Sequence, residues 1–250
     1  MNHRRRENCI HDDRYWQTKD RLSGSLLIHF NRDFLTKNET YLIKPLKNKG
    51  YMGESRTKLF QIAESQQGYF TYQQAILSGY KDKNHNYYVR EGEWRKIYRG
   101  VYRLSQYPIG EREELVVWSL WSRNRKGEPQ GVYSHYTALD LYELSDYMPS
   151  KLHLTVPKKF QRFADIPEIL VIHKNRLKEE EISSGRGYKL TMPLRTLIDV
   201  IEVNELSDDL LAQAAREAKS KGYVTKAEVE RAQEQYSQST IKKLLRYMGY

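Results

Sequence analysis

The stretch that decides the fold runs from residue 68 to residue 104 and reads GYFTYQQAILSGYKDKNHNYYVREGEWRKIYRGVYRL. Its first part predicts a short helix over residues 72–78. Thr71 precedes this helix, where its side-chain oxygen would accept from the free backbone N–H groups of the first turn. Gly79 follows and suits the left-handed conformation in which helices often end. The stretch therefore opens with a capped helix.

A tight turn and a second helix come next. Tyr80 and Lys81 form the turn, and Asp82 is in position to cap a helix over residues 83–91. Gly92 closes that helix. Two helices joined by a sharp turn are the components of a helix-turn-helix.

A β-hairpin completes the stretch. Its predicted strands cover residues 94–98 and 101–104, and Arg99 and Gly100 form the turn between them. Two helices followed by a hairpin are the layout that places one helix in a DNA major groove and a β-wing on the flanking backbone. The stretch therefore predicts a winged helix-turn-helix domain that binds DNA.

The second helix has one face suited to packing and one suited to DNA. At about 100° per residue, His85, Tyr88 and Val89 fall together and predict the packed face. The opposite face is rich in groups that donate hydrogen bonds to bases and phosphates. Together with the turn and the hairpin cations, it gives the predicted DNA-binding residues Lys81, Lys83, Asn84, Asn86, Tyr87, Arg90, Arg95, Lys96, Arg99 and Arg103. An ordinary solvated basic face is the alternative interpretation.

The charge of the chain is concentrated toward its N-terminus. The 250 residues carry a formal net charge of +10. Residues 1–51 have a net charge of +5, residues 52–107 of +4, and residues 108–250 of only +1. This distribution is expected if only the N-terminal part meets a polyanion.

These patterns predict three segments. Residues 52–107 form the DNA-binding domain, with an additional helix over residues 56–66, and residues 108–250 form a second domain. Residues 1–51 lack a sustained hydrophobic period and are predicted to be a disordered leader or to reflect a mis-assigned start before Met52. A disordered basic arm that contacts DNA is the alternative for this segment.

The second domain is predicted to be mixed α/β with a small sheet, so that the fold class of the chain is α+β. The segment from Leu115 to Leu120 is apolar almost all round, which predicts a helix buried on more than one side. Predicted strands cover residues 151–156, 170–173 and 188–191, and predicted helices cover residues 111–124, 131–144, 193–202, 206–220, 225–236 and 240–248.

The sequence gives little support for enzyme chemistry. No His pairs with another His or Cys at metal-ligand spacing, and there is no phosphate loop or dinucleotide fingerprint. Ser134 and His135 are adjacent, but neighbours in a helix point about 100° apart, so we expect a helix cap and a satisfied polar residue. The only Glu-x-Lys, at Glu217 and Lys219, lies in an Ala-rich helix away from any sheet edge. We therefore predict no enzyme, no catalytic residue, no metal and no cofactor.

A cytoplasmic location is predicted. The single Cys9 excludes an internal disulfide, as is usual in a reducing compartment. The start, MNHRRRENC, is basic but has no apolar segment behind it, which argues against a signal peptide. No run approaches the roughly 18 apolar residues of a membrane span, so no membrane partner is expected.

Several runs, in the same order, resemble the AbiEi-type antitoxins of type IV toxin–antitoxin (abortive infection) systems, which are also described as predicted transcriptional regulators. The runs are GYFTYQQAILSGY from residue 68, YYVREGEWRKIYRGVYRL from 87, EELVVWSLWS from 113, SHYTALDLYELSDYMPSKLHLTVP from 134 and TMPLRTLIDV from 191. The resemblance spans residues 55–225. Residues 1–51 match nothing in the family, and no segment resembles the nuclease-like domain that some relatives carry.

The resemblance implies a winged-helix domain that binds inverted repeats in the promoter of its own operon and represses it. It also implies a C-terminal α/β domain that counteracts a nucleotidyltransferase-like toxin without forming a stable complex with it. Carried over by position, residues 83–90 and 94–103 are the DNA-contacting elements. The resemblance thus implies a phage-defence regulator whose partners are double-stranded DNA and, functionally, a toxin.

Two other functions stay open at this point. The nearly neutral residues 108–250 suit a protein-interaction module in which the winged helix is only a scaffold. A metal-dependent nuclease acting through the second domain is the other alternative.

Overall fold

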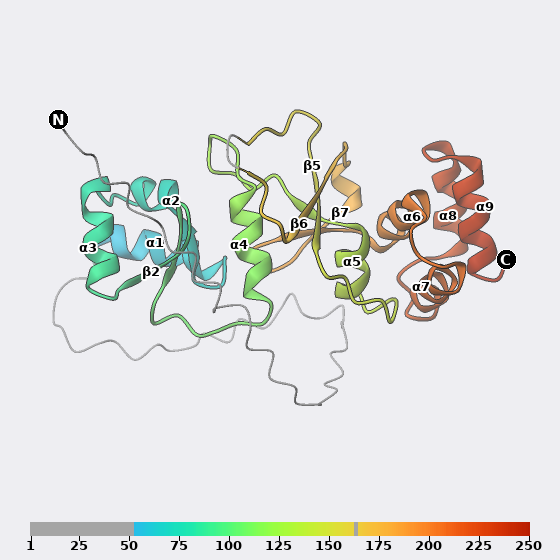
Figure 1. Ribbon diagram of the computed structural model, residues 1–250, viewed down its shortest axis with the longest axis horizontal. Coiled ribbons are helices and arrows are strands. Elements are labelled where there is room, and N and C mark those ends of the chain that lie inside the picture. Colours follow the sequence, from blue (N-terminus) through green and yellow to red (C-terminus); the bar gives the residue numbers. More distant parts are fainter. Residues whose placement is uncertain (1–52, 163–164) are drawn as a thin grey trace, which may run out of the picture. The chain divides into compact units, whose positions relative to one another are not determined.

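The computed structural model describes residues 53–162 and 165–250, so the predicted leader lies outside the described residues. The described residues belong to one compact unit. The described part combines helices with two small sheets, which confirms the predicted α+β composition (Figure 1). The division at residue 107 stays a prediction. In this described part, no helix is long and apolar enough to cross a membrane.

The smaller sheet contains the predicted hairpin. Its strands are antiparallel and lie in the order β1-β3-β2. The two hairpin strands have the predicted bounds, whereas β1 was not predicted because a segment of this length shows no alternation. The strands are β1 (Tyr69–Thr71), β2 (Trp94–Tyr98) and β3 (Val101–Leu104).

Three helices accompany this sheet: α1 (Glu54–Glu64), α2 (Tyr72–Leu77) and α3 (His85–Arg90). The predicted cap of α2 is confirmed, since the Thr71 side chain accepts from the backbone N–H of Gln74 while the Gln74 side chain accepts from the backbone N–H of Thr71. Gly79 follows with a φ of 100°, as expected for a helix that ends in a left-handed turn.

The second predicted helix begins later than expected. Residues Asp82–Asn84 form a 3-10 turn, η2, and α3 continues directly from it. Asp82 therefore does not cap the helix. The residue before α3, Asn84, keeps helical dihedral angles (φ −96°, ψ −9°), and a side-chain cap requires an extended residue at that position.

The larger sheet has five strands in the order β6-β5-β4-β8-β7. The pairings of β5 with β6 and of β4 with β8 are parallel, and those of β4 with β5 and of β7 with β8 are antiparallel. The predicted strands are found with small shifts, and two further short strands appear. The bounds are β4 (Val132–Tyr133), β5 (Leu152–Val156), β6 (Leu170–Lys174), β7 (Ile182–Ser184) and β8 (Lys189–Thr191), with a 3-10 turn, η3, at Glu179–Glu181.

Two helices lie in the segment of the chain that leads into and through the larger sheet. The first, α4 (Glu113–Trp121), is buried at every position from Leu115 to Trp121, as predicted. The second, α5 (His135–Leu141), replaces the longer helix predicted over residues 131–144. That prediction was wrong at its start because Val132 and Tyr133 pair with β5 as strand β4. Pairing with another strand here outweighs the local helical pattern.

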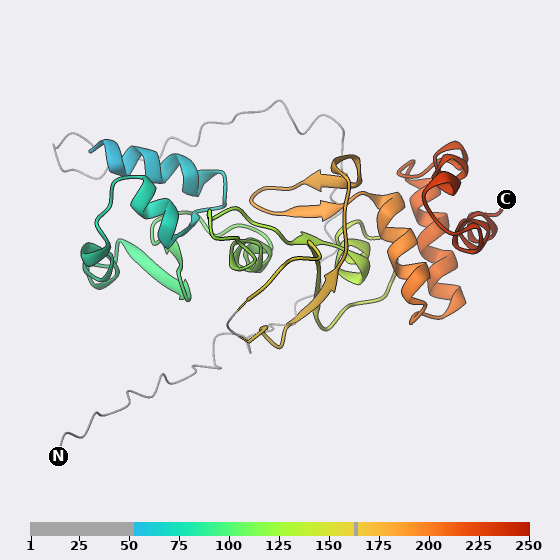
Figure 2. The same ribbon diagram turned by 90° about the horizontal axis from the view of Figure 1, so that it is seen from above.

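Four helices gather at the C-terminal end of the chain (Figures 1 and 2). Their apolar faces form one core that includes Leu197, Leu211, Ile241 and Leu244. Ser207, Thr225 and Ser237 cap three of them through side-chain oxygens. The helices are α6 (Pro193–Val203), α7 (Asp208–Ser220), α8 (Lys226–Arg231) and α9 (Gln238–Tyr247), with a 3-10 turn, η4 (Ala232–Glu234), after α8.

Candidate nucleic-acid interface

An aromatic core fixes the orientation of α3. The Tyr88 ring stacks on Trp94 of β2 at a centroid distance of 4.8 Å, and the His85 ring meets Tyr72 edge-on at 4.9 Å. Trp94 is only 2% exposed. Burial lowers the pKa of His85, which therefore packs as a neutral ring. The predicted inward face of the helix is confirmed.

The opposite face of α3 is solvent-exposed. Tyr87 leaves 48% of its surface exposed, so its ring is accessible to a ligand. The Arg90 guanidinium lies over the Tyr87 ring at 5.7 Å and also approaches Glu91 at 3.7 Å. Eight of the predicted DNA-binding residues are exposed, namely Lys81, Lys83, Asn86, Tyr87, Arg90, Arg95, Lys96 and Arg99, and Asn84 is half-buried.

The hairpin presents its cations on an edge strand. β2 pairs only with β3 in this sheet, and Arg95, Lys96 and Ile97 are exposed in succession. The register between the two strands shifts between Lys96 and Tyr98, as in a β-bulge. Such a bulge bends the strand, increases its local twist and can redirect a side chain.

Arg103 has to be withdrawn from the predicted DNA-binding residues. Its residue exposure is 4%, and its guanidinium donates to Glu113 at 3.0 Å. The same Nη2 atom donates to the backbone carbonyls of Tyr107 and Pro108. Glu113 also accepts from the Tyr69 hydroxyl at 2.9 Å. Because Arg103 lies on the inner side of β3, it fastens the sheet to α4 and does not reach a ligand on the surface.

Three histidines that are far apart in the sequence lie together, two in the larger sheet and one at the start of α5. His153 Nδ1 and His173 Nε2 are 2.9 Å apart, and the His135 ring stacks on His173 at 3.6 Å. Burial lowers the pKa of His135 to about 3 and that of His153 to about 4, and it also lowers the pKa of His173. No sequence pattern signals this cluster, because its members come from three separate elements, α5, β5 and β6.

The same cluster corrects the interpretation of Ser134. Its hydroxyl lies 2.8 Å from His135 Nδ1 and 2.7 Å from Thr155 Oγ1, and it does not cap α5. The helical argument against a Ser–His contact was wrong because His135 adopts a φ of 50°, outside the helical region. Ser134 is fully buried, so a substrate does not reach its hydroxyl. Among residues 53–162 and 165–250, no group of His, Cys, Asp or Glu has a metal-holding arrangement.

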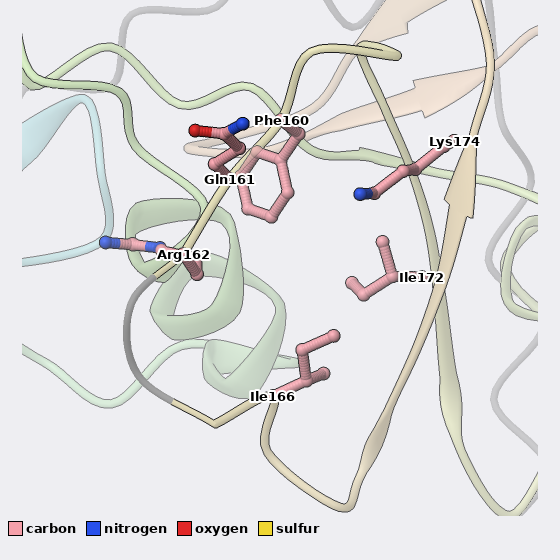
Figure 3. Close-up of a pocket in the computed structure, with 6 residues that line it drawn as sticks. All are labelled: Phe160, Gln161, Arg162, Ile166, Ile172 and Lys174. Carbon is pink, nitrogen blue, oxygen red and sulfur yellow. The ribbon is translucent and has the colours of Figure 1, made fainter.

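A surface pocket of about 320 Å³ lies beside β6. Figure 3 shows the Lys174 side chain reaching toward Phe160 above Ile172, while the Arg162 side chain points away from the other residues. The pocket is lined by Phe160, Gln161, Arg162, Ile166, Ile172 and Lys174. A cation and an apolar wall of this kind do not define a reaction.

Comparison with known proteins finds a match for the segment that runs from within α1 to the end of β3. The model of the family described as "Transcriptional regulator, AbiEi antitoxin" matches residues 58–105. Among curated proteins, no match to the chain is found. The resemblance to the AbiEi family is therefore confirmed over this segment, and it indicates an antitoxin or transcriptional regulator.

Proposed function

We propose, from the match of residues 58–105 to the AbiEi family, that this protein is a sequence-specific DNA-binding transcriptional repressor of its own operon. In this proposal α2, η2 and α3 form a helix-turn-helix, and the β2–β3 hairpin is its wing. The protein would also serve as the antitoxin of a type IV toxin–antitoxin (abortive infection) system. It would act in the cytoplasm by binding alone, without an enzymatic step.

The observation that carries the proposal is the two-faced character of α3. Aromatic packing through Tyr88 and His85 holds the helix rigidly, while Asn86, Tyr87 and Arg90 remain exposed beside it. Asn and Arg side chains make the bidentate contacts that distinguish adenine and guanine in the major groove. A rigid helix that exposes these side chains is the arrangement that base readout requires.

The hairpin supplies contacts of a different kind. Arg95, Lys96 and Arg99 are exposed cations on or beside an edge strand, where they can approach phosphates on the flanking backbone. Such contacts increase affinity for any sequence and make it dependent on salt. Base readout and backbone contacts are thus assigned to two different elements of the segment.

Binding of the full chain to duplex DNA from immediately upstream of its own gene tests this proposal. Affinity is measured by fluorescence anisotropy at several salt concentrations, with a scrambled duplex as the competitor. We expect Asn86→Ala to weaken cognate binding by about 1–3 kcal/mol and to relax discrimination at one base pair. Arg176→Gln, which changes an exposed cation after β6, is the matched control and should bind normally.

Two outcomes would contradict the assignment of α3. An equal loss on cognate and scrambled DNA would mean that Asn86 does not read a base. Weak wild-type binding without sequence preference would leave the helix-turn-helix as a scaffold and favour a protein-interaction module.

The antitoxin activity is proposed for residues 108–250, and it needs a separate assay. A nucleotidyltransferase-like gene adjacent in the operon would be induced alone or together with the full chain or residues 108–250, and growth would be followed. Rescue by both proteins, without co-purification of the toxin, is the expected result. Failure of the full chain to restore growth would contradict the antitoxin proposal without affecting the repressor proposal.

A further inference from the structure

Two arginines lie next to the β2–β3 turn without a carboxylate partner. Arg123 follows the C-terminal end of α4, and Arg162 follows β5. Within residues 53–162 and 165–250, neither takes part in an ion pair. Both belong to the nearly neutral part of the chain, which the charge distribution did not associate with a polyanion.

Two hydrogen-bond donor atoms of Arg162 are buried and have no partner among the described residues. Its guanidinium lies over the Trp121 ring at 5.0 Å. Its Nε and Nη2 atoms are buried, and no acceptor lies within hydrogen-bond distance in the described structure. A buried donor without a partner costs free energy, and more so when it carries charge. Figure 3 shows this side chain directed away from the neighbouring pocket, so the pocket residues do not satisfy it.

Arg123 lies next to the turn of the β2–β3 hairpin. Its Nη1 atom donates to the carbonyl of Leu120 at 2.8 Å. Its Nη2 atom lies so close to Gly100 that a Cβ atom there would be 2.6 Å away. Burial lowers the pKa of Arg123, and the nearby positive charge of Arg162 lowers it further. The two guanidinium groups repel each other and neither has an ion-pair partner among the described residues, an arrangement that favours a bound anion.

The surrounding surface extends the exposed cations of the hairpin. Arg125 and Lys126 are exposed in the loop that follows Arg123. Gln73 of α2 donates to the backbone carbonyl of Arg125 at 3.0 Å, which attaches this loop to the segment proposed to bind DNA. Arg99 is exposed in the turn next to Gly100. The cationic surface therefore continues from the hairpin onto the loop after α4.

We propose that Arg123 and Arg162 form a binding site for a phosphate oxyanion, and that a backbone phosphate of bound DNA occupies it. A planar guanidinium offers two parallel N–H donors to a phosphate, which makes Arg the side chain suited to this ligand. The source of the phosphate rests on the proposed DNA binding, whereas the oxyanion site itself does not. The site would place one DNA contact outside the segment that matches the family, in residues 108–250.

Inorganic phosphate tests the oxyanion site without DNA. The thermal unfolding midpoint of the full chain is measured with increasing phosphate at constant ionic strength, for the wild type, Arg123→Gln, Arg162→Gln and the control Arg176→Gln. A ligand that binds only the folded state raises this midpoint. We expect a rise for the wild type and Arg176→Gln, and none for Arg123→Gln and Arg162→Gln. An equal rise in all four proteins, or none in the wild type, would overturn the site. If Arg162→Gln does not fold, Arg123→Gln and Arg162→Lys decide the outcome.

Duplex DNA distinguishes the two sources of the phosphate. Each site variant should lower the slope of log affinity against log salt concentration by about one unit, because one phosphate contact is lost. Arg176→Gln should keep the wild-type slope. Unchanged slopes together with a lost phosphate effect would assign the site to a free phosphate compound and refute its occupation by DNA. Failure of the wild type to bind any DNA would refute the proposed function, while the phosphate titration would still decide the oxyanion site.

Discussion

Gly68 and Gly92 both have a left-handed backbone, but only one of them lies against another side chain. Their φ angles are 87° and 74°. A Cβ atom on Gly68 would lie 2.5 Å from Cγ of Tyr107, whereas nothing lies within 4 Å of a Cβ atom on Gly92. Substituting Gly92 therefore introduces backbone strain alone, whereas substituting Gly68 introduces both backbone strain and a steric clash.

Gly92→Ala should cost about 1 kcal/mol, because an L-residue is strained in this conformation. Gly68→Ala should cost at least about 2 kcal/mol, because the same strain is joined by a clash with Tyr107 in a packed environment. Urea unfolding followed by circular dichroism measures both free energies. Equal costs for the two variants would show that Tyr107 moves aside freely.

At the scale of elements, a buried ion network connects α6 with η3 and with the segment after η4. Arg195 donates to Asp199 at 2.8 Å and to Glu181 at 3.0 Å, and the Tyr236 hydroxyl also donates to Glu181. The side chains of Arg195 and Asp199 are 7% and 4% exposed. One guanidinium thus compensates two buried carboxylates, Glu181 of η3 and Asp199 of α6.

Arg195→Met should destabilise the protein by about 3–5 kcal/mol, because it leaves two carboxylates without their cation in a buried site. The exposed pair of Lys226 and Glu230 on α8, at 3.7 Å, is the control. Lys226→Met should cost less than about 1 kcal/mol, since water screens this pair. Denaturant unfolding of the three proteins checks both values, and a loss below about 1 kcal/mol for Arg195→Met would contradict the structural role of the network.

The elements that the sequence predicted well are those with local signals. The capping box at Thr71 and Gln74 and the turn at Arg99 and Gly100 involve neighbouring residues, so their geometry follows from short-range chemistry. The short strands β1 and β4 were missed because their hydrogen-bond partners lie far along the chain, and β7 was missed because it has only three residues. Pairing with a distant strand leaves no periodic pattern in so few residues.

In the candidate site, too, the residues whose exposure depends on local structure were predicted, and the residue whose burial depends on a distant contact was not. The exposure of Asn86 and Arg90 followed from helical periodicity, which requires only the residues of the helix itself. The burial of Arg103 depends on Glu113, which belongs to the next helix and is reached only in the folded chain. The sequence shows that Arg103 lies in a strand, but alternation along a strand does not decide which of its two faces meets solvent.

At the scale of the whole molecule, the histidine cluster links stability to pH. His135, His153 and His173 meet only when α5, β5 and β6 are assembled, so they regain ordinary pKa values near 6.5 in the unfolded chain. In the folded protein, burial lowers all three pKa values. Below pH 6.5 these three rings therefore bind fewer protons in the folded state than in the unfolded state.

The sign of the effect follows from this difference. Above about pH 6.5 the rings are neutral in both states, and their contribution to stability is fully present. As the pH falls toward 4, the three histidines bind protons in the unfolded chain but stay neutral in the folded chain. The free energy of unfolding therefore decreases. Asp199 opposes this trend, because burial raises its pKa to about 6 and the folded state then binds its proton more readily. A variant at one histidine is needed to separate the effect of the histidines on stability from that of Asp199.

His135→Asn is that variant, because Asn tolerates the positive φ of this position and keeps a polar side chain beside Ser134. Between pH 6.5 and 4, the unfolding free energy of the wild type should fall more steeply than that of the variant, by about 1 kcal/mol per pH unit. Urea unfolding at half-unit pH intervals measures both slopes, and Asp199 and His85 contribute equally to each. Parallel slopes would mean that His135 is protonated in the folded protein, and the stacked neutral cluster would then be wrong.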